Sequence, residues 1–352
     1  MSTLWRAYID ALKYFNIDGW FIYGALDYKV KSPFEIDREI VKKDVNRWEV
    51  RTTFHTPDGD LTQLSVSPKA DSSTVIEKVI KDFKSDFKKV RHLYQDIIGY
   101  DDTVFKMQKK ELGELGMMAN TITVPGLHVF VVLFNGSLEA ATYAYYDYPE
   151  LFQELCELYE KTSLKQVELA IEAGTDSILT GGSGSITMQS PELWRRMSLP
   201  TLKKISKICK EAGVISGVHS CGKERYIVEA LALETDIDYV NPLEIPLMGD
   251  CDLGECKEKF GDKIALMGNI HTSNVMLQGS VDDVKAESLK AILVAGRNGG
   301  FVLSTGDQCG RDTPDENIFA MIKTVKEFGV YPLDFDRIKE EIKKLERGKK
   351  SE

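Results

Sequence analysis

The segment Ile215-Ser-Gly-Val-His-Ser-Cys-Gly222 ends a short apolar run on two side chains that can bind metal ions, His219 and Cys221. Residues two apart on an extended chain point the same way, so both side chains are expected to face one side. Imidazole and thiolate are common zinc ligands. The pair alone is weak evidence, because free cysteines are also common in protein cores.

A third ligand of this kind stands in Ser304-Thr-Gly-Asp-Gln-Cys-Gly310, which follows another apolar run. His219, Cys221 and Cys309 would form a His/Cys/Cys set, and three protein ligands leave one coordination position open, which is typical of a catalytic zinc site. We expect Glu244 to fill the fourth position at rest. The alternative for Glu244 is a carboxylate that lies on the surface or supports the ligands.

Two further residues are candidates for catalytic roles, His271 and Asp307. His271 follows a predicted strand and could orient a substrate, although a structural role is equally open. Asp307 stands two residues before Cys309 and could support the metal ligands or hold substrate. Cys251 and Cys256 lack CxxC spacing, and on a helix residues five apart diverge, so we predict two free thiols.

The elements that must position these residues alternate regularly from about residue 150 onward. Helical patterns and short apolar runs predict βαβ units and a parallel sheet. The predicted strands cover residues 19–23, 176–180, 214–219, 239–241, 264–267 and 301–304, and the predicted helices cover 150–172, 200–212, 224–233, 253–260, 281–295 and 313–328. This series favours a (β/α)₈ TIM barrel, whose active sites lie at the C-terminal ends of the strands. A doubly wound open sheet is the alternative, but its phosphate-binding glycine fingerprint is not seen.

The first 130 residues are less regular. Residues 47–55 and 61–67 alternate around Thr56-Pro-Asp-Gly-Asp60, which predicts a β-hairpin. Two helices are expected to follow, over residues 73–96 and 102–112. We predict one barrel domain spanning residues 1–352, with residues 45–115 as an N-terminal elaboration of hairpin and helices. The C-terminal segment is expected to be a solvated helix that docks through Ile338, Ile342 and Leu345.

The chain has 352 residues, with 55 acidic and 45 basic side chains and a net charge of −10. Proteins that bind nucleic acids usually carry a basic surface, so this class is excluded. The longest apolar run, residues 128–134, is too short to span a membrane. The N-terminus carries no pattern of a secretory signal, so the expected location is cytoplasmic.

Five segments together resemble a known family. They are Pro200-Thr-Leu-Lys-Lys-Ile205, His219-Ser-Cys-Gly222, Asn241-Pro-Leu-Glu244, Leu266-Met-Gly-Asn-Ile270 and Cys309-Gly-Arg-Asp-Thr-Pro-Asp-Glu-Asn317. In this order, over roughly residues 150–330, the pattern resembles the uroporphyrinogen decarboxylase superfamily and, within it, the zinc-dependent corrinoid methyltransferases. The resemblance implies a barrel that holds Zn²⁺ through His219, Cys221 and Cys309, with a family glutamate that falls on Glu244.

The resemblance also implies a methyltransferase. No arginine-rich motif of the true decarboxylases is found in residues 1–50, which argues against decarboxylation. No Asp-x-His-x-x-Gly motif is found either, so the corrinoid is expected on a separate partner protein. The loop Gly306-Asp-Gln-Cys309 departs from the pattern of the thiol-methylating enzymes. This departure favours an O-demethylase that takes methyl groups from a methoxylated aromatic compound.

Alternatives remain open at this point. They are methyl transfer from a corrinoid to a thiol of the coenzyme M type and, further away, a decarboxylase-like lyase or a non-catalytic metal-binding barrel. The stretch Tyr143-Ala-Tyr-Tyr-Asp-Tyr148 could wall a pocket for an aromatic ring, with core packing as the alternative. A homodimer is also left open.

Overall fold

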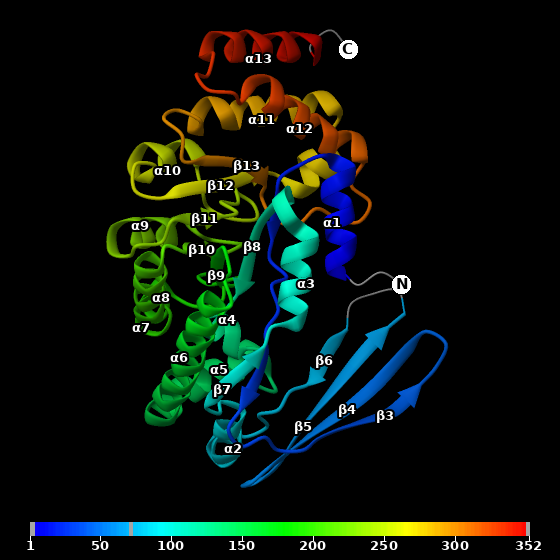
Figure 1. The fold of residues 1–352 in the computed structure, drawn as a ribbon, viewed down its shortest axis with the longest axis vertical. Helices are drawn as coiled ribbons and strands as arrows, with labels where there is room; N and C mark the ends of the chain where they lie inside the picture. Colours follow the sequence, from blue (N-terminus) through cyan, green and yellow to red (C-terminus); the bar gives the residue numbers. More distant parts are fainter. Residues whose placement is uncertain (1–3, 70–72, 350–352) are drawn as a thin grey trace.

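A computed structural model describes residues 4–69 and 73–349 of the chain. Its centre is a curled parallel sheet in which neighbouring strands follow the order β1-β8-β9-β10-β11-β12-β13 (Figure 1). The strands are β1 (Gly19–Phe21), β8 (Gly116–Thr121), β9 (Ser177–Gly181), β10 (Ile215–His219), β11 (Tyr239–Asn241), β12 (Ala265–Ile270) and β13 (Phe301–Thr305). This curled seven-stranded sheet with surrounding helices confirms the predicted barrel-like α/β fold, and β8 is a strand that the sequence pattern missed.

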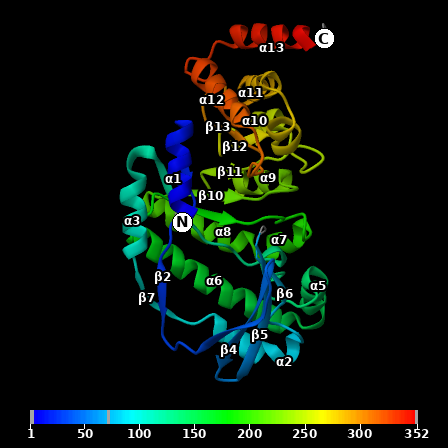
Figure 2. The same ribbon diagram turned by 90° about the vertical axis from the view of Figure 1, so that its right-hand side faces the viewer.

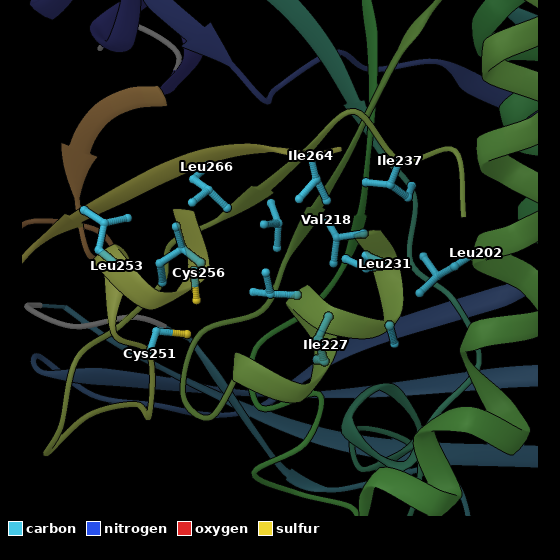
Figure 3. Close-up of a cluster of buried hydrophobic side chains, with 14 of the residues drawn as sticks. Leu202, Val218, Ile227, Leu231, Ile237, Cys251, Leu253, Cys256, Ile264 and Leu266 are labelled. Atoms are coloured by element: carbon cyan, nitrogen blue, oxygen red, sulfur yellow. The ribbon is translucent and has the colours of Figure 1, made fainter. Parts of the chain in front are cut away.

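Helices cover the outside of the sheet. They are α6 (Pro149–Glu172), α7 (Pro191–Met197), α8 (Leu199–Ala212), α9 (Arg225–Glu234), α10 (Leu253–Phe260), α11 (Val281–Ala295) and α12 (Asp315–Phe328). One side of each strand packs against them, and Figure 3 shows side chains of this layer, among them Val218, Leu231 and Leu266. Full burial of such a side chain contributes about 1.5–3 kcal/mol, so this layer is a main source of stability.

The two ends of the sheet, β1 and β13, are joined through helices. In the first helix, α1 (Leu4–Phe15), the Tyr14 hydroxyl donates to Asp315 Oδ2 of α12 at 2.9 Å. The rings of Phe15 and Phe319 lie 5.2 Å apart between the same two helices. The first and last helices of the barrel therefore pack together and complete the ring of elements.

The inside of the sheet is filled at the end where the strands begin. Trp20 of β1 donates its indole N–H to the Tyr239 hydroxyl of β11 at 2.9 Å, across the barrel. Gly217 of β10 makes room for this ring, because a Cβ there would lie 2.1 Å from Tyr239 Cζ. His219 pairs in register with Asn241 at the other end of these strands. The packed floor thus leaves the C-terminal ends of the strands for polar side chains.

The N-terminal part forms a separate antiparallel sheet of β3 (Ile36–Lys43), β4 (Arg47–Thr56), β5 (Gly59–Pro68) and β6 (Thr74–Glu77). It lies at the opposite end of the molecule from the C-terminal helix (Figure 2). The β4–β5 hairpin confirms the prediction from the turn sequence. A second pair, β2 (Asp27–Val30) and β7 (Ile97–Asp101), is also antiparallel.

The predicted helix over residues 73–96 is wrong in its first half. Residues Thr74–Glu77 form strand β6, which pairs with β5, and helix α2 covers only Phe83–Val90. Asp82 stops any earlier start, because its side chain caps α2 by accepting the Ser85 N–H at 2.8 Å. β-branched residues in the segment Thr74-Val-Ile-Glu77 favour the strand over the helix.

The other helices agree with the sequence pattern where it made a prediction. Helix α3 covers Thr103–Leu112, and the short helices α4 (Leu127–Phe130) and α5 (Ser137–Asp147) follow β8. The C-terminal helix α13 (Phe335–Lys349) docks through buried Ile338 and Ile342, as predicted, with Leu345 packed beside them. Among the described residues no helix combines the length and apolar character needed to cross a membrane.

Candidate metal centre

The predicted site residues lie at the C-terminal ends of four consecutive strands of the sheet. His219 ends β10 and Cys221 follows it, while Glu244 lies in the loop after β11. His271 directly follows β12, and Asp307 lies in the loop between β13 and α12. Because β10, β11, β12 and β13 are neighbours in one parallel sheet, these loops share one rim of the barrel.

Three of these side chains form a group that could hold a metal ion. One ligand atom each of His219, Cys221 and Asp307 lies within 4.8 Å of the other two, and all three residues are half-buried. The Cys221 thiol is within hydrogen-bonding reach of the Asp307 carboxylate and of the Ser183 hydroxyl. The structure therefore brings together two predicted metal ligands and one predicted catalytic residue.

The pKa shifts of His219 and Cys221 are compatible with the binding of a cation by this group. Burial lowers the pKa of His219, and the Asp307 carboxylate and the neighbouring Asn241 amide partly oppose this shift, so the imidazole is neutral near pH 7. Burial raises the pKa of the Cys221 thiol. A metal ion would favour the thiolate and supply the charge that balances the carboxylates.

Glu244 lies beside this group with one oxygen unused. It is 5% exposed, and its Oε2 accepts the Gly222 N–H at 2.5 Å, which ties it to the segment that carries Cys221. Its Oε1 is buried and has no hydrogen-bond partner among the residues that the structure describes. A buried carboxylate oxygen without a partner is unusual and points to a missing partner such as a cation.

The backbone that carries Glu244 is held by groups that the sequence pattern did not reveal. Leu243 has a left-handed φ of 62°, and its N–H donates to Glu224 Oε2 at 2.7 Å. Its carbonyl accepts the Asn269 amide at 3.0 Å, and the Glu244 carbonyl accepts the Cys251 N–H at 3.0 Å. These bonds fix a strained turn, so they fix where Glu244 lies.

From the sequence, Glu224 was predicted only to begin the helix over residues 224–233. Asp250 performs that capping role, since its Oδ1 accepts the backbone N–H groups of Glu224 at 2.7 Å and of Arg225 at 3.0 Å. The Glu224 side chain is therefore free to turn inward, where it is fully buried. A single sequence offers no signal for this exchange, because Asp250 lies 26 residues from the helix start whose N–H groups it accepts.

His271 has a fixed tautomer at the same rim. Its Nδ1 accepts the backbone N–H groups of Ser273 at 3.2 Å and of Asn274 at 3.1 Å, at the start of the turn Thr272–Leu277. The ring proton therefore sits on Nε2. His271 also lines a cavity of about 400 Å³ together with Asn269 and the loop after Glu244. It is suited to donate a hydrogen bond and not to bind a metal through Nε2.

Cys309 is not part of the group. Its thiol is half-buried beside the hydroxyls of Thr305 and Thr313, and it packs against the layer between sheet and helices. Its role as a metal ligand stays a prediction.

Comparison with known proteins shows to which family this chain belongs. The sequence model of the family Uroporphyrinogen decarboxylase (URO-D) matches residues 85–328. The chain belongs to this family. It is 28% identical over 181 residues to the methylcobamide:CoM methyltransferase MtaA of Methanosarcina barkeri, covering 51% of this chain and 50% of that protein. It is 25% identical over 239 residues to a uroporphyrinogen decarboxylase of Pelodictyon phaeoclathratiforme, covering 65% of each.

A solved methyltransferase from Methanosarcina mazei shares the fold, with a TM-score of 0.55, 18% sequence identity, and coverage of 75% of this chain and 74% of that one. The chain spans about half the length of the methyltransferases it matches by sequence. The resemblance of this URO-D family chain to both a decarboxylase and a methyltransferase leaves the reaction to be argued from the site.

The prediction about the geometry of two cysteines in this URO-D family chain is wrong. Cys251 and Cys256 were expected to diverge, but their thiols are in hydrogen-bonding contact. Cys251 precedes Asp252, the capping residue of α10, and Cys256 lies one turn inside the helix. These are the two positions that meet in a hydrophobic staple. Both cysteines are free thiols, as predicted.

The aromatic stretch of this URO-D family chain lies on helix α5. Tyr145 and Tyr146 line an open pocket of about 800 Å³ between α5, α6 and α7, together with Arg195 and Arg196. The residues that line this pocket include none of the metal centre. The pocket is therefore no extension of that centre.

Proposed function

We propose that this protein moves a methyl group from a methoxylated aromatic compound to the Co(I) corrinoid of a separate partner protein, with zinc at the centre formed by His219 and Cys221. The observation that carries this proposal is the convergence of a nitrogen, a sulfur and a carboxylate oxygen at the rim of the barrel. The unpartnered oxygen of Glu244 beside them supports it. The similarity to a methylcobamide:CoM methyltransferase supports the class of reaction.

The residues present fit zinc. Histidine nitrogen, cysteine sulfur and carboxylate oxygen are its usual ligands in proteins. When bound, zinc would supply Lewis acidity that stabilises negative charge on the ether oxygen. Glu244 would complete the set at rest. The loop after β13 would offer the third ligand, which is Cys309 by the family pattern, and it also carries Asp307, a carboxylate within 4.8 Å of the ligand atoms of His219 and Cys221.

Methyl transfer itself needs few groups from the protein. The electron pair of Co(I) forms the cobalt–carbon bond while the electrons of the carbon–oxygen bond leave with the phenolate, which takes up a proton from water. His271 offers its Nε2–H at the same rim, suited to a polar substituent of the ring. The half-buried ligands limit the access of water to the centre.

The alternative is methyl transfer from a methylated corrinoid to a thiol, which the similarity to MtaA favours. Decarboxylation of a polycarboxylate is not proposed. The arginine-rich motif of the true decarboxylases is not found in residues 1–50.

The proposal is tested by mixing the protein with a reduced corrinoid protein and a methoxybenzoate. We expect the spectrum of methyl-cobalt to appear together with the phenol. His219→Asn should abolish turnover, whereas His92→Asn is a matched control, since His92 contacts Asp58 in the N-terminal part. If none of the methoxyarenes tested gives methyl-cobalt, but preformed methyl-cobalt loses its methyl group to a thiol, the alternative is correct.

A further inference from the structure

We infer that Cys251 and Cys256 form a redox site, and that a disulfide between them weakens the metal centre through the loop that begins at Glu244. The methyl-transfer mechanism does not use these two thiols. The effect on the metal centre rests on the function proposed above, whereas the chemistry of the thiol pair does not.

The first argument is the contact between the two thiols. Cys251 stands just before the capping residue of α10 and Cys256 lies one turn inside the helix, so their side chains meet. Figure 3 shows the two sulfur atoms pointing toward one another, and the Cys251 thiol donates a hydrogen bond to the Cys256 sulfur. A disulfide forms when the sulfur atoms approach from this contact to a bond length of about 2.0 Å.

The second argument is the reactivity of the pair. The hydrogen bond from Cys251 lowers the pKa of the Cys256 thiol, and although burial opposes this shift, the charge of Arg225 supports it. The thiolate is the form of cysteine that reacts as a nucleophile. A cysteine with thiolate character beside a second cysteine is typical of redox sensors, because the second thiol completes a disulfide.

The third argument is the access of an oxidant. Both thiols are buried, with exposed fractions of 1% for Cys251 and 2% for Cys256. However, Cys251 lines a cavity of about 400 Å³ between the loop after β11 and helix α11, together with Pro246 and Leu253. One water molecule occupies about 30 Å³ in the liquid. The cavity therefore has room for an oxidant as small as hydrogen peroxide.

Oxidation of the pair by a peroxide proceeds in two steps. The Cys256 thiolate attacks one oxygen of hydrogen peroxide, the oxygen–oxygen bond breaks, and the product is a sulfenic acid and water. The Cys251 sulfur then attacks the Cys256 sulfur, the sulfur–oxygen bond breaks, and a second water molecule leaves. Two thiols thus lose two electrons and two protons, and one peroxide becomes two molecules of water. A dithiol reductant reverses the change by thiol–disulfide exchange.

The fourth argument is the connection between this pair and the metal centre. The Cys251 N–H donates to the Glu244 carbonyl at 3.0 Å. Gly249 packs so closely that a Cβ there would lie 2.3 Å from the Glu244 carbonyl oxygen and 2.6 Å from the Gly222 carbonyl oxygen. These contacts transmit a displacement of the Cys251 backbone to the residue that is expected to complete the metal site.

The test oxidises the zinc-loaded protein with hydrogen peroxide and maps its cysteines by mass spectrometry. We expect the peptide that contains Cys251 and Cys256 to lose the mass of two hydrogen atoms, and dithiothreitol to restore it. The affinity for Zn²⁺, measured in competition with a chelator, should fall by about 10-fold on oxidation, which is the effect typical of residues that support metal ligands. It should return on reduction.

Three variants make the test specific to this pair. Cys251→Ser and Cys256→Ala should each fold like the parent and keep their affinity for Zn²⁺ after treatment with peroxide. Cys156→Ser is the matched control, because Cys156 is another buried free thiol, on helix α6, and this variant should respond as the parent does. Circular dichroism of each variant confirms that it is folded.

A parent protein whose Cys251 and Cys256 stay reduced in peroxide would overturn the inference and leave the proposed function intact. A disulfide that forms without any change in the affinity for Zn²⁺ would do the same. A parent protein that binds no Zn²⁺ even when reduced would overturn the proposed function and, with it, the link from the thiols to the metal.

Discussion

Replacement of Glu224 by glutamine should change how the stability of the protein depends on pH. Glu224 is fully buried, and its Oε2 accepts the Leu243 N–H at 2.7 Å. Its Oε1 has no partner within the described part of the chain. Burial raises the pKa of this carboxyl well above its ordinary value of 4.5, and the nearby acidic groups of Cys256, Glu244 and Asp250 raise it further. The folded protein therefore keeps this proton to a higher pH than the unfolded chain does.

The proton that Glu224 keeps in the folded state sets the sign and size of the change in the free energy of unfolding with pH. Above pH 4.5 the unfolded chain has lost this proton while the folded chain keeps it. The free energy of unfolding therefore falls with rising pH by about 1.4 kcal/mol per pH unit until the folded pKa is reached. Glutamine keeps an acceptor for the Leu243 N–H and does not titrate.

The assay is urea-induced unfolding at pH 6, 7 and 8 for the parent and for Glu224→Gln. The parent should lose stability relative to the variant as the pH rises. Glu258→Gln, which changes an exposed carboxylate on the neighbouring helix α10, is the control and should follow the parent. Parallel pH profiles of Glu224→Gln and the parent would show that Glu224 is ionised in the folded protein and would refute this reasoning.

Three other variants test separate parts of the account. Glu244→Gln should keep the fold, weaken Zn²⁺ binding by about 10-fold or more in competition with a chelator, and change the rate of turnover. Tyr239→Phe removes the acceptor of the half-buried Trp20 N–H and should destabilise the protein by about 1–3 kcal/mol in urea unfolding. His55, whose pKa is raised by hydrogen bonds to two aspartates, should stabilise the fold at pH 5.5 but not at pH 8.5, so His55→Gln should lower the urea midpoint only at the lower pH.

Each of these expectations has a clear contrary result. Identical Zn²⁺ affinity and kinetics in Glu244→Gln would make that residue a bystander. Unchanged stability of Tyr239→Phe would show that another acceptor serves the indole. An equal effect of His55→Gln at both pH values would mean that the charge of His55 contributes nothing to the stability of the fold.

The parts of the fold that follow from the sequence are those with a strong local period. Helices α10 and α11 begin and end at the predicted residues, because capping residues and apolar spacing agree there. Strand β8 was missed, because Gly116-Met-Met-Ala-Asn-Thr121 has few of the β-branched residues that mark strands and forms only between two neighbours. Strand β6 was taken for helix for a related reason, since its pairing with β5 is a non-local contact.

The candidate site, like the fold, could be predicted from the sequence only in part. His219 and Cys221 could be predicted, because a strand end fixes which side chains face the barrel. The position of Asp307 beside these two residues could not be predicted, since it depends on the hydrogen bonds of the loop after β13. Glu224 was invisible to the sequence argument because its partner is a backbone group of another loop.

The central claim is that a methyl group passes from an aryl ether to cobalt at this centre. The most direct test is a single turnover of the zinc-loaded protein with a reduced corrinoid protein and a methoxybenzoate that carries a CD₃ group. The account predicts CD₃–cobalt and the phenol in equal amounts by mass spectrometry, and neither product with His219→Asn. Phenol without labelled cobalt, or no phenol from any methoxyarene, would contradict it.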